Sequence, residues 1–127
     1  MRFAFVFVAG VVALSGCSKK PSAEDACKRI EATGVGANCK ASQPGGIGAA
    51  AVEKFEFDLP SVPGKTGQIL RFDNEEKYTG AATAFASAAV LAGPHQYGSK
   101  KALVFVQANS GLSSADGAKL KAVVDAL

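Results

Sequence analysis

The most regular pattern in the chain is Glu53-Lys54-Phe55-Glu56-Phe57-Asp58-Leu59. Its apolar residues at 55, 57 and 59 fall on one face of an extended strand, and the acidic residues at 56 and 58 fall on the other. A strand with one apolar and one wet face is typical of antiparallel sheets. We therefore expect a domain built around an antiparallel or mixed sheet.

Working outward from this stretch, the chain alternates between helix and strand signals. Further strands are predicted at 38–41, 68–72 and 102–106, and the last is apolar on both faces, which favours the centre of the sheet. Helices are predicted from Ser22 to about residue 33, from 74 to 92, and from Ser113 or Ser114 to the end. The order α-β-β-β-α-β-α predicts an α+β fold, with a three- to four-stranded sheet against which the helices pack.

The helices carry recognisable caps and apolar stripes. Ser22 and Asp25 have the spacing of a capping box. The Ala-rich helix at 74–92 is expected to cover Phe105, because its apolar side chains recur at helical spacing. Those side chains are Tyr78, Ala82, Phe85, Ala89 and Ala92, and the last helix has a similar stripe of Leu120, Val123, Val124 and Leu127.

The first sixteen residues have the composition of an export signal. Arg2 provides a positive charge, and an apolar run follows it at positions 3–14. Such a run has the length of a signal-peptide core and is too short to span a bilayer comfortably. We expect residues 1–16 to be removed on export.

Leu14-Ser15-Gly16-Cys17 ends this segment and resembles the lipobox of bacterial lipoproteins, a resemblance that covers residues 1–17 only. It implies that the Cys17 thiol is joined to diacylglycerol, that the chain is cut before Cys17, and that in many bacteria the freed amine is acylated too. Acyl chains, at about 0.8 kcal/mol per buried CH₂, would make attachment permanent. Ser18, where an Asp would favour retention in the inner membrane, favours the outer membrane facing the periplasm.

The rest of the chain is then a lipidated tether at 17–22 and one globular domain at 23–127, since 127 residues suffice for a single domain. Removing residues 1–16 takes away Arg2 and leaves thirteen basic against eleven acidic residues. So small a net charge argues against a nucleic-acid partner. The expected partners are the membrane, through the N-terminal lipid, and an envelope protein or peptidoglycan.

Cys27 and Cys39 are the two cysteines that remain once Cys17 carries lipid. An exported domain meets an oxidising compartment, where such a pair usually closes. Two free thiols or a metal site are the alternatives, but the chain has a single histidine and no CxxC pair. We expect a structural disulfide and no metal.

The segment 93–101 carries that histidine, His95, together with Tyr97, Ser99 and Lys100. We expect a polar loop, in which an imidazole that titrates near neutrality, a phenol and an amine would bind an anion. No carboxylate nearby in sequence orients the imidazole for acid–base work. A solvated loop is therefore favoured, in which His95→Ala costs under about 1 kcal/mol.

Two classes of function follow. The first is a non-enzymatic, membrane-anchored binding or structural module, with no catalytic residue assigned. The second is a small envelope hydrolase or ligand-binding protein that uses His95, Tyr97 and Lys100. The sparse catalytic groups favour the first. Residues 46–51 fit the dinucleotide pattern G-x-G-x-x-A but lack the strand before it and the long helix after it, so no cofactor is expected.

Overall fold

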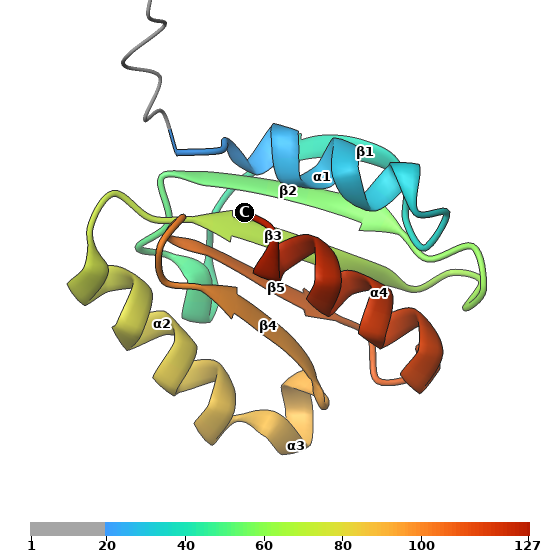
Figure 1. Cartoon of the computed structure of the whole chain (residues 1–127). Helices are drawn as coiled ribbons and strands as arrows, with labels where there is room; N and C mark the ends of the chain where they lie inside the picture. The colour runs from blue at the N-terminus through green and yellow to red at the C-terminus, as the bar shows by residue number, and fades with distance from the viewer. Residues whose placement is uncertain (1–19) are drawn as a thin grey trace, which may run out of the picture.

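A computed structural model describes residues 20–127 (Figure 1). The predicted signal peptide at 1–16, Cys17 and the first residues of the predicted tether lie outside the described part of the chain. Within 20–127, no helix has both the length and the apolar character needed to cross a bilayer. In chain order the elements are α1 (Ala23–Ala32), β1 (Ala37–Ser42), the 3-10 turn η1 (Gly46–Gly48), β2 (Glu53–Asp58), β3 (Thr66–Arg71), α2 (Glu75–Ser87), α3 (Ala89–Ala92), β4 (His95–Ser99), β5 (Val104–Ala108) and α4 (Ser114–Asp125).

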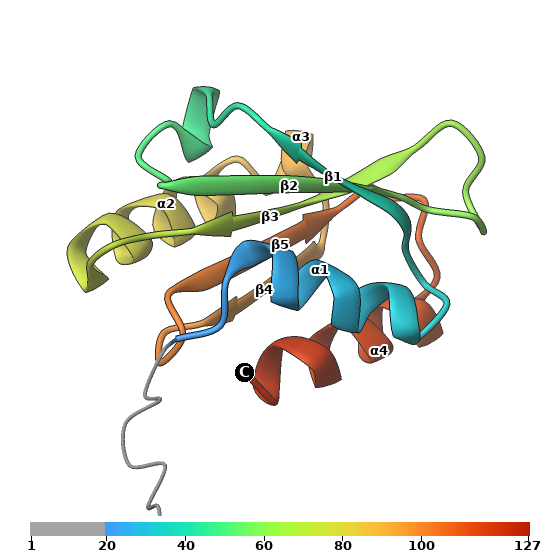
Figure 2. The same ribbon diagram turned by 90° about the horizontal axis from the view of Figure 1, so that it is seen from above.

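The strands form one antiparallel sheet in the order β1-β2-β3-β5-β4. Helices α1 and α4 lie on one face, and α2 lies on the other with η1 and α3 (Figure 1, Figure 2). The α+β class is therefore confirmed. The sheet has five strands where three or four were predicted, and a short helix follows α2.

The added strand is β4, the segment expected to be a loop. It pairs with β5 from His95 opposite Ala108 to Ser99 opposite Val104. The prediction of a loop was wrong because this strand is polar along most of its length. A half-buried strand is recognised in a sequence by the alternation of apolar and polar residues, and this strand lacks that alternation.

The apolar strand predicted at 102–106 is β5, which begins two residues later at Val104. It is paired along both edges, by β3 and β4, and is therefore an interior strand, but the prediction that it occupies the centre of the sheet was wrong by one position. The middle position in the sheet belongs to β3.

The face under α1 and α4 holds the larger core. The Ser22 side chain caps α1 by accepting from the Asp25 amide at 3.0 Å, and the Asp25 carboxylate accepts from the Ser22 amide at 3.1 Å. Ser113 caps α4 in the same way, accepting from Asp116. Both predicted caps are confirmed. The largest fully buried side chains on this face are Ile30, Phe57, Leu59, Ile69, Val104, Val106, Leu120 and Val124.

A disulfide joins Cys27 of α1 to Cys39 of the edge strand β1, with the Cα atoms 6.0 Å apart. The predicted pairing is present. The Glu31 carboxylate lies within 4.8 Å of both sulfur atoms. Because the two sulfurs are bonded to each other, they offer no thiolate to a metal ion.

The other face is covered by α2. The Phe105 ring of β5 stacks on Phe85 of α2, with ring centroids 4.9 Å apart and planes 21° apart. This confirms that the Ala-rich helix covers Phe105. The single helix predicted at 74–92 is wrong in one respect: it ends at Ser87 and resumes as α3. Ala89, predicted on the buried face, is exposed because of that break.

Candidate functional site

His95 is buried rather than solvated, with 8% of its surface exposed. Its Nε2 lies 2.7 Å from the Leu112 carbonyl oxygen, and its Nδ1 lies 2.8 Å from the Tyr97 hydroxyl. A carbonyl can only accept a hydrogen bond, so Nε2 carries the proton; in the neutral ring Nδ1 then accepts from the Tyr97 O–H. Nε2 thus ties β4 to the segment that leads into α4, and Nδ1 is engaged by a second residue of the same strand.

The backbone of α4 closes the space above this ring. A Cβ atom on Gly117 would lie 2.5 Å from the Tyr97 hydroxyl and 2.7 Å from His95 Nδ1. Only a residue without a side chain fits there. Burial also raises the pKa of the Tyr97 hydroxyl above its ordinary value. The pair is packed as part of the fold, and α4 leaves no room for a substrate on its side of the pair.

Ser99 and Lys100 are directed elsewhere. The Ser99 hydroxyl accepts from the Ala102 amide at 3.1 Å and closes the β4–β5 turn. Lys100 Nζ lies 2.9 Å from a Glu75 carboxylate oxygen at the start of α2, which raises the pKa of the lysine. The four residues predicted to form a ligand loop therefore do not converge on one point.

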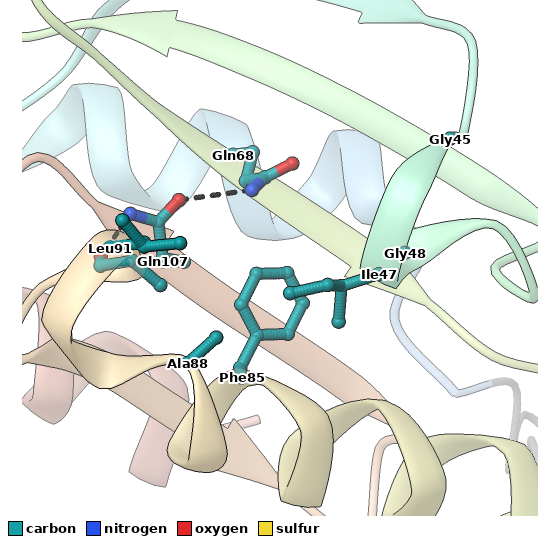
Figure 3. Close-up of a pocket in the computed structure, with 9 residues that line it drawn as sticks. Gly45, Ile47, Gly48, Gln68, Phe85, Ala88, Leu91 and Gln107 are labelled. Atoms are coloured by element: carbon teal, nitrogen blue, oxygen red, sulfur yellow. Dashed lines mark hydrogen bonds between the residues drawn. The ribbon is translucent and has the colours of Figure 1, made fainter.

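A cleft of about 340 Å³ lies on the opposite face of the sheet, between η1 and the α2–α3 segment (Figure 3). Its floor is formed by Gln68 of β3 and Gln107 of β5, which are paired in the sheet register. The Phe85 ring lies beside them. The lining residues are Gly45, Ile47, Gly48, Gln68, Phe85, Ala88, Leu91, Ala92 and Gln107.

The two floor amides have fixed orientations. Gln107 Nε2 donates to the Ala92 carbonyl at 2.6 Å, so its Oε1 faces the other way, towards Gln68. Gln68 Nε2 donates to that Oε1 at 2.9 Å. The Gln68 Oε1 consequently points away from Gln107, as Figure 3 shows, and accepts no hydrogen bond from the described residues. The cleft thus presents one oriented acceptor.

A third glutamine supports the wall of the cleft. Gln96 of β4 lies opposite Gln107 in the register, and its Nε2 donates to the Phe85 carbonyl at 2.9 Å and the Gly93 carbonyl at 3.0 Å. Carbonyls at the end of a helix need partners of this kind. Gln96 and Gln107 therefore hold the α2–α3 segment against the sheet at the point where the helix breaks.

The rim of the cleft is apolar and open to solvent. Leu91 has 91% of its surface exposed, Val90 beside it has 98%, and Ile47 on η1 has 42%. We call Val90 and Leu91 the α3 tip. Gly93, with a φ of 81°, ends α3 in a conformation that a residue with a side chain rarely adopts. Contiguous exposed apolar patches are a feature of interaction surfaces, and Val90 and Leu91 are the two most exposed large apolar side chains among the described residues.

The segments around the cleft contain no charged residue. Residues 41–52, which include η1, and residues 78–99, which include most of α2 and all of α3, lack Asp, Glu, Lys and Arg entirely. Charged residues are depleted at the centre of protein interfaces. Chemical motifs did not predict this site, because its signal in the sequence is the absence of charged residues over two long stretches.

The α3 tip lies on the side of the domain away from its N-terminal end. In Figure 1 and in the perpendicular view of Figure 2, the chain enters at Lys20 on one side, and α3 lies on the other. No protein-family model, curated protein or solved structure matches this chain.

Proposed function

We propose that the protein is a lipid-anchored lipoprotein of the bacterial cell envelope, whose domain binds a protein partner and is not an enzyme. The anchor is Cys17, within the lipobox-like Leu14–Cys17 segment, and the expected location is the outer membrane facing the periplasm. The observation that carries the binding function is the α3 tip, an exposed apolar pair beside an uncharged cleft.

The placement of the tip supports this proposal. Four residues lie between Cys17 and the helix cap Ser22, so the chain takes five residue steps from one to the other; fully extended, at most about 3.6 Å per step, it spans about 18 Å. The end of the domain near Lys20 is therefore held close to the bilayer. The α3 tip lies on the opposite side of the domain, an arrangement that supports its presentation to the periplasm in the anchored protein.

The alternative of a hydrolase or ligand-binding protein that uses His95 has less support. A general base must reach the proton that it abstracts. Both His95 nitrogens are already hydrogen-bonded inside the fold, and Gly117 leaves no space beside them. The peptidoglycan alternative finds no support in the uncharged rim, since the stem peptides of that polymer carry charged groups.

The anchor is tested by feeding labelled palmitate to cells that express the full chain. We expect label in the wild type, none in Cys17→Ser, and an accumulated precursor when the wild type is treated with globomycin. A wild-type chain without fatty acid would overturn the anchor.

The binding surface is tested in the same cells with a photo-reactive amino acid at Leu91. We expect a discrete cross-linked protein that disappears when Ile47→Asp is added. The matched control places the same amino acid at Ala122, an exposed position on α4. Equal cross-linking from Ala122, or turnover of ester substrates that His95→Ala abolishes, would contradict the proposal.

A further inference from the structure

The cleft is selective enough to indicate what occupies it. We infer that it takes one uncharged, aliphatic residue on an extended segment of a periplasmic protein, with a peptide N–H of that segment donating to Gln68 Oε1. This inference rests on the proposed binding function and specifies its ligand.

The size of the cleft sets the scale of the occupant. About 340 Å³ lies at the lower end of the range for sites that enclose small molecules, so the cleft accommodates a side chain and its adjacent peptide groups rather than a folded surface. The rest of the partner would lie over the rim, against the α3 tip and Ile47.

The lining determines the chemistry of that side chain. Ile47, Phe85 and Leu91 offer apolar contacts, and no lining residue carries a charge. A charged group buried here would lose its hydration without gaining a partner, which is strongly unfavourable. The occupant is therefore aliphatic and neutral.

The oriented acceptor determines the backbone contact. Gln68 lines the cleft, and the chain of bonds through Gln107 to the Ala92 carbonyl engages its Nε2 and leaves its Oε1 available as an acceptor. A donor on the occupant would complement it. The main-chain N–H of an extended segment provides one at every non-proline residue, beside the side chain that enters the cleft.

Two other occupants of an apolar surface fit less well. The proposed anchor at Cys17 lies within about 18 Å of Ser22, at the end of the domain away from the α3 tip, so the anchored domain would turn its tip away from the bilayer. Two copies anchored in the same leaflet would both point their tips away from the membrane, so neither tip would face the other.

The test uses the mature chain purified from its own cells, placed in phospholipid nanodiscs and observed through its isoleucine and leucine methyl resonances by NMR. The probe is N-acetyl-leucine methylamide, a neutral aliphatic residue with two peptide groups. We expect saturable shifts at Ile47 and Leu91. Ile30 and Ile69, fully buried on the opposite face of the sheet, are internal controls that should not move.

Selectivity comes from matched probes and variants. N-acetyl-lysine methylamide and N-acetyl-aspartate methylamide are expected to bind at least about tenfold more weakly. Gln68→Leu should weaken the leucine probe about fivefold through loss of one hydrogen bond, whereas Gln43→Leu, at an exposed position outside the lining, should not. Leu91→Asp changes a residue too exposed to disturb the fold and should abolish binding.

Three outcomes would overturn the inference: no saturable shift at Ile47 and Leu91, equal binding of the charged probes, or broadening of Leu91 by a paramagnetic lipid in the nanodisc. Broadening of Leu91 by the paramagnetic lipid would show that the α3 tip contacts the bilayer. Palmitate labelling tests the anchor independently. A chain that incorporates palmitate but does not bind the leucine probe would support the proposed anchor and contradict the inferred ligand.

Discussion

Phe105 of β5 and Phe85 of α2 form the one stacked aromatic pair among the described residues, with ring centroids 4.9 Å apart. Both rings are buried, and they join the Ala-rich helix to the sheet through side chains large enough to fill the space that alanines leave. The cleft wall formed by Phe85 depends on this contact.

We expect Phe105→Ala to reduce the free energy of unfolding by about 3–5 kcal/mol, because it removes a buried ring and leaves a cavity. A domain of this size has about 5–10 kcal/mol in total, so the variant should be nearly unfolded or sensitive to protease. Urea denaturation measures the loss. Leu91→Ala is the control, since that side chain is almost fully exposed and its loss should cost under about 0.5 kcal/mol. A near-neutral Phe105→Ala would contradict the packing described here.

His95→Ala should destabilise the protein by about 1–3 kcal/mol, more than a solvated loop would lose. It removes a buried ring that bonds the Leu112 carbonyl and the Tyr97 hydroxyl, and it leaves that carbonyl without its partner. A double-mutant cycle with Tyr97→Phe should give a non-additive coupling energy, because the two side chains share one hydrogen bond. Additive losses in the cycle, or a loss below about 0.5 kcal/mol for His95→Ala, would show that the hydrogen bonds of His95 contribute nothing to stability.

Replacing both Cys27 and Cys39 by serine should lower the free energy of unfolding by about 3 kcal/mol, the value expected from the entropy of closing a loop of this length. Thermal unfolding of the two forms compares them directly. Mass mapping without reductant should recover one linked peptide pair from the wild type. Two thiols that react with an alkylating agent in the native protein would contradict the disulfide.

The capping box at Ser22 and Asp25 predicts a loss of stability in acid. The hydrogen bond from the Ser22 amide holds the pKa of Asp25 below its ordinary value of 3.8 in the folded protein. A depressed folded-state pKa contributes stability that is fully present above the unfolded value and is lost as the pH falls through the folded one. Asp25→Asn should therefore reduce the slope of unfolding free energy against pH below about pH 4.

The control for that slope is Glu24→Gln. Glu24 lies in the same first turn of α1, but its carboxylate makes no hydrogen bond to the described residues. It should leave the acid slope close to that of the wild type. If both variants flatten the slope equally, the helix terminus as a whole is responsible and the Ser22 contact is not.

The parts of the fold that the sequence predicted are those governed by local patterns. The alternation at residues 53–59, the serine caps and the apolar strand before residue 108 each depend on a few neighbouring residues, and each lies where it was predicted, within two residues. The disulfide was predictable because the proposed lipidation of Cys17 leaves only one pair of cysteines.

The missed features depend on residues far apart in the chain. β4 is a strand because it pairs with β5 and because Leu112 and Gly117 accommodate the His95 ring, contacts that no local pattern contains. The segment is held on the two sides of the break after Ser87 by Gln96, which bonds Phe85, and by Gln107, which bonds Ala92. The cleft arises from the same long-range register, so its floor could not be assembled from the sequence, although its lack of charge was visible there.

The disulfide between α1 and β1 also determines how the domain responds to force. A pull on the N-terminal end enters the fold at Ser22 and can unwind α1 only as far as Cys27, about one turn, before it meets a covalent bond to Cys39. Beyond that point the load passes into β1 and is shared by its backbone bonds to β2. The disulfide to the edge strand therefore limits how far α1 can unfold under tension. Force on the tether would be transmitted to the sheet while the rest of α1 stays packed on the core.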